Sequence, residues 1–380
     1  MADIKVADLQ EQASAATGLH DFGDPYYLEG LTRLVESANA EAKLSEAGAP
    51  RFAGAMVGYL VNRLKVVHYA KSHPELLAAP VAKPMFVFGL PRTGTTLTIN
   101  LLASDPMRRT YMRWESLNSV PPPSANWRED PRYLAEVEKM AMSLKYMPHI
   151  SAIHHEDADS PSECQFAMAQ SFCAEVFDSQ WQIPSYRKWF LYEADYKPAF
   201  EYQKMQLQVL QAEMGGRWTL KNPWHPLYLP AIREVYPDAQ FVMTHRDPVA
   251  VVGSACSLLR AVRPLYSDDV VMAEIAEALL ETFDLMIERS EAYRAANGPD
   301  SICDIDYKEQ MADPIGTMRR VYAHFGEELS GEAATAMQAT LDANPQGKHG
   351  KHSYSLEEFG LTADQIKERF AGYIAKYGLG

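Results

Sequence analysis

The segment that most constrains the fold is a short apolar run that leads directly into a glycine-rich loop. Residues 85–88 (Met-Phe-Val-Phe) are bounded by Pro84 and Gly89. This length and these flanks are typical of a buried strand in a parallel sheet. From Thr95 onward the sequence (TTLTINLLAS) has the pattern of a helix that ends near Asp105. Strand, glycine turn and helix in this order predict one βα unit.

Strand and helix patterns continue to alternate along the rest of the chain. Further short apolar runs are predicted as strands at residues 109–114, 218–220, 241–244 and 302–305. This alternation predicts an α/β fold that is P-loop-like and three-layered (α/β/α), with a central parallel sheet of about five strands. Residues 1–80 carry apolar side chains at helical spacing, so we expect a helical N-terminal region that packs on an α/β domain spanning residues 81–380.

The net charge limits the ligands that the chain can bind. The sequence has 36 basic and 50 acidic residues, a net charge of −14. We therefore expect no binding to nucleic acid, which needs a basic face, or to anionic membranes. No secretory signal or membrane span is visible, and the four cysteines are scattered, so we expect a cytoplasmic protein without a metal site. A local basic pocket for a small anion remains compatible with this charge.

The loop from Gly89 to Gly94 has the frame of a P-loop but lacks the lysine of that motif. In nucleoside triphosphatases a lysine follows the second glycine, whereas Thr95 stands there in this chain. Arg92, inside the loop, carries the positive charge instead. Backbone N–H groups and the N-terminus of the next helix still favour an anion. We expect a ligand with a shorter anionic chain than ATP, bound without a metal.

A second anion site is predicted at the end of the strand at 241–244. Arg246 follows this strand, and Ser254 comes eight residues later on a helix that Asp247 and Pro248 open. A guanidinium can hold a phosphate through two parallel hydrogen bonds, and a serine hydroxyl can add another. Carboxyl ends of parallel strands meet at one edge of a sheet, so this site should lie beside the glycine-rich loop.

A third basic element lies near the C-terminus. It is the stretch from 347 to 352, which begins with Gly347, Lys348 and His349. Glycines and cations in one loop are compatible with a segment that covers a phosphate, but a charge run is also typical of a solvated surface.

These segments resemble the sulfotransferases that use 3′-phosphoadenosine 5′-phosphosulfate (PAPS), in the bacterial branch related to tyrosylprotein sulfotransferases. Residues 89–97 (GLPRTGTTL) resemble the family's 5′-phosphosulfate loop, and the spacing of Arg246 and Ser254 resembles its 3′-phosphate site. Residues 220–241 resemble the stretch that precedes this site, and the match spans about residues 80–355. Tyrosylprotein relatives have a second arginine where this chain has Leu258, which argues against a protein tyrosine as acceptor.

The resemblance implies an enzyme that moves a sulfuryl group from PAPS to a hydroxyl of a small acceptor, leaving 3′-phosphoadenosine 5′-phosphate (PAP). The donor would be bound by the two anion motifs and the third basic element, that is by Arg92, Thr93, Gly94, Thr95, Thr96, Leu97, Arg246, Ser254, Gly347, Lys348 and His349. The implied catalytic residues are Glu115 as general base and Lys221 as acid or charge stabiliser, with Arg92 on the sulfate. His225, His154 and His155 are alternative bases.

The acceptor pocket is the least specified part of the site. Residues 166–196 are rich in aromatic side chains, which favours either core packing or a pocket for a hydrophobic acceptor within a helical insertion at 165–215. Phenols, alcohols, sterols and sugars stay open as acceptors, and so does a homodimer. Two other functions remain: a P-loop small-molecule kinase, which would need Mg²⁺ and ATP, and a non-catalytic nucleotide-binding protein.

Overall fold

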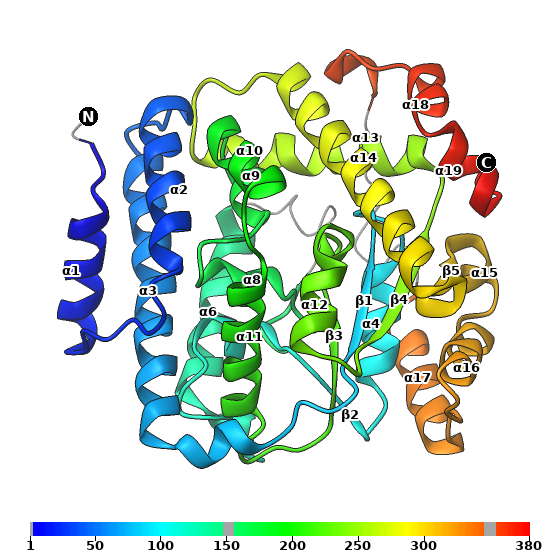
Figure 1. The fold of residues 1–380 in the computed structure, drawn as a ribbon, viewed down its shortest axis with the longest axis horizontal. Helices are drawn as coiled ribbons and strands as arrows, with labels where there is room; N and C mark the ends of the chain where they lie inside the picture. The colour runs from blue at the N-terminus through cyan, green and yellow to red at the C-terminus, as the bar shows by residue number, and fades with distance from the viewer. Residues whose placement is uncertain (1–2, 147–155, 346–354) are drawn as a thin grey trace.

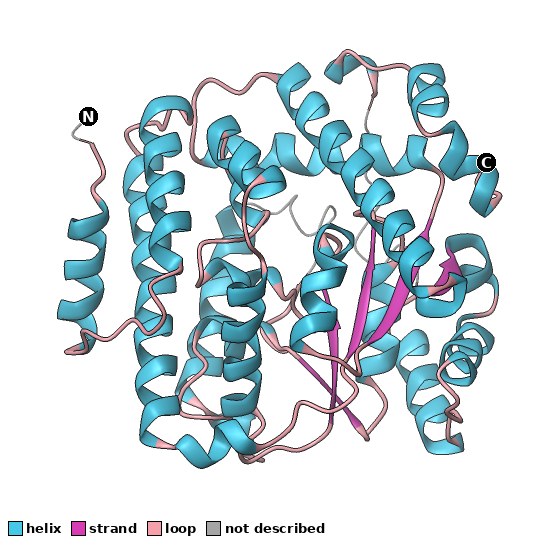
Figure 2. Cartoon of the chain, in the orientation of Figure 1, coloured by secondary structure: helices cyan, strands magenta, loops and turns pink. Residues whose placement is uncertain are grey.

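The computed structural model describes residues 3–146, 156–345 and 355–380. In this part of the chain one parallel sheet lies between layers of helices (Figures 1 and 2). Its order is β2-β3-β1-β4-β5, with β1 at Met85–Gly89, β2 at Arg108–Thr110, β3 at Arg217–Lys221, β4 at Gln240–His245 and β5 at Cys303–Asp306. The predicted P-loop-like α/β fold with about five parallel strands is confirmed.

The helices fall into groups along the chain. The N-terminal group is α1 (Val6–Thr17), α2 (Tyr27–Glu41) and α3 (Gly48–Ser72). After β1 come α4 (Thr95–Ala103), α5 (Arg113–Leu117) and α6 (Pro131–Tyr146), and the mid-chain group is α8 (Gln165–Ala169), α9 (Val176–Gln180), α10 (Pro184–Tyr192) and α11 (Lys197–Leu210). The later helices are α12 (Leu229–Val235), α13 (Pro248–Val262), α14 (Met272–Asn297), α15 (Tyr307–Ala312), α16 (Pro314–His324), α17 (Gly331–Ala343), α18 (Ala363–Arg369) and α19 (Ala371–Tyr377).

Strand β1 is the centre of the sheet and is buried on both faces. It pairs with β3 on one side and β4 on the other, and every residue of it is buried. Successive side chains alternate between faces. Phe86 and Phe88 join the large apolar cluster, whereas Met85 and Val87 join a smaller cluster with α4, α16 and α17. This two-sided burial explains why the strand reads as a continuous apolar run.

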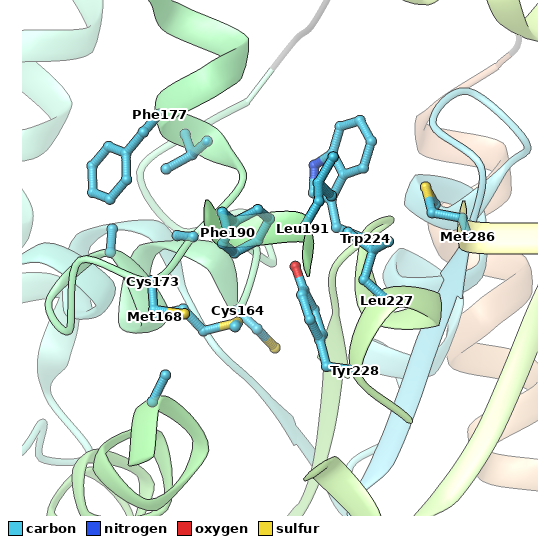
Figure 3. Close-up of a cluster of buried hydrophobic side chains, with 14 of the residues drawn as sticks. Cys164, Met168, Cys173, Phe177, Phe190, Leu191, Trp224, Leu227, Tyr228 and Met286 are labelled. Carbon is cyan, nitrogen blue, oxygen red and sulfur yellow. The ribbon is translucent and has the colours of Figure 1, made fainter. Parts of the chain in front are cut away.

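The large apolar cluster joins the N-terminal and mid-chain helices to the sheet. It runs from Leu9 in α1 through Phe177 in α9 to Leu379. Figure 3 shows Phe177, Phe190, Trp224 and Tyr228 gathered in it. Most aromatic residues between 166 and 196 are therefore core residues, which agrees with core packing, one of the two interpretations that the sequence allowed.

One predicted strand was wrong over four of its six residues. The strand expected at 109–114 ends at Thr110, and Arg113 already begins α5. The N–H groups of Arg113 and Trp114 donate to the carbonyl oxygens of Ser160 and Ala158 rather than to a neighbouring strand. Hydrogen bonds to the segment at 158–160 therefore hold residues 113 and 114 away from the sheet.

Helix α13 is the one candidate membrane span in the described ranges. The window from Pro248 to Leu265 is long and apolar enough by composition, but 56% of it is buried inside the molecule. The helix packs on α14 and contributes Val251, Val252 and Cys256 to the core. This packing is that of a core helix in a folded domain.

Candidate functional site

The glycine-rich loop is shaped by two glycines in the positive-φ region. Gly89 has a φ of +148°, and a Cβ there would lie 2.3 Å from the Thr244 carbonyl oxygen. Gly94 has a φ of +104°, and a Cβ there would lie 2.9 Å from Gln310 Oε1. Only glycine fits such positions without displacing its neighbours. Helix α4 begins directly after Gly94 with no side-chain cap, so its first N–H groups are of the kind that can bind an anion.

Arg92 connects the two predicted anion motifs. Its backbone has a φ of +71°, which costs about 1 kcal/mol or more for a residue with a side chain. Its Nε donates to Ser254 Oγ over 3.1 Å, and its carbonyl oxygen accepts from Arg246 Nη1 over 3.0 Å. The Arg246 guanidinium also lies over the Tyr307 ring, 4.3 Å from the centroid. The structure therefore brings Arg92, Arg246 and Ser254 into one group.

A cavity of about 850 Å³ opens beside this group. Its polar part is formed by the loop and its surroundings, namely Pro91, Arg92, Gly94, Thr95, Thr96, Leu97, Arg246 and Tyr307. Apolar side chains line another part: Phe166 and Val176 from the mid-chain segment, Trp224 from the loop after β3, Leu258, Leu259 and Val262 from α13, and Leu279 from α14. One cavity thus joins an anion-binding surface to an apolar one.

Two residues that were predicted to bind PAPS, Thr93 and Ser254, do not line the cavity but lie directly behind its surface. Thr93 is fully buried, and its hydroxyl donates to the Leu90 carbonyl oxygen over 2.6 Å and lies 2.6 Å from Thr244 Oγ1. Thr93 therefore holds the loop in shape. Ser254 is also outside the cavity lining and meets it through its bond to Arg92.

Lys221 and Glu163 form an ion pair at the carboxyl end of β3. Lys221 Nζ lies 2.7 Å from Glu163 Oε1, and the Cys164 N–H donates to the Lys221 carbonyl oxygen over 2.8 Å. Lys221 is buried, whereas Glu163 lines the cavity. Gln165, which also lines the cavity, donates to the second oxygen of Glu163. Sequence reasoning did not assign a role to Glu163, because 58 residues separate it from Lys221.

Glu115, the predicted base, is not brought to this cavity. Its side chain is 1% exposed and lies outside the cavity lining. Oε2 accepts from Arg109 Nη2 over 2.9 Å, and Oε1 accepts from the Met112 N–H over 3.0 Å. Burial raises the pKa of this carboxyl, and the Arg109 charge opposes that rise. A general base must reach the proton that it takes, and this geometry instead favours a structural ion pair.

Of the three histidines considered as alternative bases, only His225 lies among the described residues. His225 is fully buried among aromatic rings, including those of Phe86 and Tyr228, and is outside the cavity lining. Burial lowers the pKa of His225 to about 3, so the ring is neutral near pH 7. His154 and His155 lie outside the described residues, as do Gly347, Lys348 and His349 of the third basic element.

The arginines near Leu258 do not replace the missing second arginine. Leu258 itself lines the cavity. Arg260 pairs with Glu358 at the surface, and Arg263 is buried and donates to the Asp178 carbonyl oxygen over 2.9 Å. Of Arg246, Arg260 and Arg263, which are all described residues, Arg246 alone lines the cavity.

Fold and site define a P-loop-like α/β protein in which a glycine-rich loop and Arg246 share one cavity at the carboxyl edge of a parallel sheet. Among the described residues, no group of three or more His, Cys, Asp or Glu side chains is arranged to hold a metal. The chain belongs to the sulfotransferase family, whose model matches residues 84–331. The resemblance inferred from the two anion motifs is thereby confirmed.

Three bacterial relatives illustrate the similarity. The crystal structure of sulfotransferase STF9 from Mycobacterium avium is 33% identical, with a TM-score of 0.92, over 100% of this chain and 98% of that one. The structure of STF1 from Mycobacterium tuberculosis is 32% identical, with a TM-score of 0.88, over 97% of this chain and 99% of that one. Omega-hydroxy-beta-dihydromenaquinone-9 sulfotransferase Stf3 from Mycobacterium bovis is 25% identical over 83% of this chain and 79% of that one.

Proposed function

We propose that this sulfotransferase moves a sulfuryl group from PAPS to a hydroxyl of an apolar small molecule. The observation that carries the proposal is the single cavity, which combines the glycine-rich loop and Arg246 with an apolar wall. Its volume of about 850 Å³ lies in the range of small-molecule sites. The expected cytoplasmic location is part of this proposal and is supported by four cysteines that are free thiols.

The residues of the polar part fit PAPS. Gly89 and Gly94 let the loop pack against Thr244 and Gln310 in its positive-φ shape, and the uncapped start of α4 would offer N–H groups to a phosphosulfate. Thr95 and Thr96 add hydroxyls from the cavity lining. Arg246, held against Tyr307, would bind the separate 3′-phosphate, and Ser254 would support this site from behind through its bond to Arg92. When bound, the donor supplies the sulfuryl group and leaves as PAP.

We assign the general base to Glu163 rather than to Glu115. Glu163 lines the same cavity as Arg92, so its carboxylate can meet an acceptor hydroxyl and take its proton. Lys221, 2.7 Å away, holds this carboxylate in place and keeps a positive charge at the end of β3. Arg92 and the N-terminus of α4 supply further positive potential where negative charge develops on the leaving group.

The apolar wall favours an acceptor with a hydrophobic body. Trp224, Leu258 and Leu279 come from three different segments and line this part of the cavity. The name of the Stf3 relative describes a hydroxyl on a menaquinone as its substrate, which supports an apolar alcohol for this chain too. A sulfate-transfer assay with a panel of phenols, sterols and sugars tests the assignment, and exclusive use of sugars would contradict it.

Leu258→Trp is expected to reduce acceptor use without weakening donor binding. The larger ring would occupy apolar space in the cavity, and one misfit group in such a pocket costs about tenfold or more in kcat/KM. The measurement is kcat/KM for 2-naphthol, with PAP affinity measured by calorimetry. Leu134→Trp is the matched control, because Leu134 is 48% exposed on α6. Equal losses in both variants would contradict the placement of the acceptor.

A further inference from the structure

A second cavity lies apart from the sulfotransferase site. It has a volume of about 400 Å³, and none of its lining residues belongs to the first cavity. Its walls come from the segment that leads into α2, from α3 and from α11. In Figure 1 these three helices stand together toward the N-terminal side of the molecule. Nothing in the proposed transfer reaction uses this space.

Arg63 of α3 is the buried charge in the lining of this cavity. Its side chain is 3% exposed. Four of its five N–H groups donate to neutral oxygens: the carbonyls of Phe22 (2.8 Å), Gln170 (3.2 Å) and Asp24 (2.9 Å), and the hydroxyl of Ser171 (3.1 Å). The fifth hydrogen, on Nη2, is not used by these bonds. The guanidinium is therefore well oriented and still able to donate.

The buried positive charge of Arg63 is offset in the described parts of the chain only at a distance, by the exposed Asp24 carboxylate. No ion pair there includes Arg63, and its guanidinium instead lies between the rings of Tyr27 (4.7 Å) and Tyr202 (4.6 Å). Such stacking offsets only part of the cost of burying a cation. Burial accordingly lowers the pKa of Arg63, while the two tyrosines and the Asp24 carboxylate oppose that change.

The rest of the cavity is suited to an apolar body. Val67, Ala70 and Met205 line it beside the tyrosine rings. The other charged residues of the lining are Asp24, Lys71 and Glu201, and all three are exposed at the rim. Solvent and salt screen exposed charges, so the inner end of the cavity is positive and its walls are apolar.

We propose that this cavity binds a small amphipathic carboxylate, with the carboxylate on the Arg63 guanidinium and the apolar body against Val67 and Met205. The remaining N–H of Nη2 would donate a charge-assisted hydrogen bond to the carboxylate, so that all five N–H groups of Arg63 would be used. The aromatic walls would enclose a ring or a short chain.

The test is calorimetric titration of the full chain with 4-phenylbutanoate and with its methyl ester. We expect saturable binding of the acid and affinity at least about tenfold weaker for the neutral ester, since a hydrogen bond to a charged group contributes about 1.5 kcal/mol or more. Absence of saturable binding, or equal affinity for acid and ester, would overturn the proposal.

Two variants locate the bound acid. Met205→Trp should fill the second cavity and abolish binding, and it avoids Arg63, whose bonds also tie the N-terminal segment to residues 170 and 171. Leu258→Trp fills part of the first cavity and should leave the affinity unchanged. The opposite pattern would place the acid in the acceptor pocket and refute the second site.

Discussion

Replacing Glu163 by glutamine is expected to lower kcat by about 10²- to 10⁴-fold, the usual contribution of a general base. The amide keeps the shape of the side chain but cannot take the proton of the acceptor hydroxyl. The affinity for PAP should stay unchanged, because donor binding is assigned to the loop and Arg246. A sulfate-transfer assay gives kcat, and calorimetry gives the PAP affinity.

Glu115→Gln is the matched comparison, since both variants remove the carboxylate partner of a buried cation, but only Glu163→Gln should lose turnover in the folded protein. Glu115 neutralises Arg109, which is also buried, so loss of the carboxylate charge should lower the free energy of unfolding by about 3 kcal/mol or more. The folded fraction should retain kcat. If Glu115→Gln kept its thermal stability and lost turnover while Glu163→Gln stayed active, the base would be Glu115.

Replacing Arg246 by methionine is expected to weaken PAP binding about 100-fold. Two hydrogen bonds from a guanidinium to a phosphate contribute about 1.5 kcal/mol or more each, and about 1.4 kcal/mol corresponds to a factor of ten in affinity. The loss should shrink as salt concentration rises, because salt weakens charge contacts. Calorimetric titration with PAP at low and at moderate salt measures both effects.

Arg260→Met is the control for this loss. Arg260 lies on the same helix as Ser254 but pairs with Glu358 at the surface, outside the cavity. Its removal should leave the PAP affinity unchanged. Equal weakening in both variants would mean that general charge, rather than a 3′-phosphate contact at Arg246, governs donor binding.

The sequence predicts those parts of the fold and site whose residues follow one another directly in the chain. The run at 85–88, the glycines of the loop and the start of α4 follow each other directly, so one βα unit and its anion site are readable. The same holds for β4 and Arg246, because a strand end and the next helix start are local patterns. The two anion motifs lie side by side because they follow parallel strands, whose carboxyl ends share one edge of the sheet.

The catalytic assignment depends on contacts between distant residues and could not be read in that way. Glu115 has the right place after a strand, but Arg109 and the helix start at Arg113 turn it into a buried pair. Glu163 gains its place only because its segment returns to the end of β3, where it meets Lys221. Tyr307, which supports Arg246, is likewise distant in the sequence and is brought beside Arg246 by the pairing of β4 with β5.

The most direct test of the donor assignment is a calorimetric titration of the purified chain with PAP and with ATP, each without and with added Mg²⁺. Thr95 stands where a triphosphate-binding loop has its lysine, and two separate anion-binding groups meet on one cavity. We therefore expect saturable binding of PAP at one site and no comparable binding of ATP, with or without added Mg²⁺. Tight Mg²⁺-dependent binding of ATP together with weak binding of PAP would contradict this account and point to a kinase.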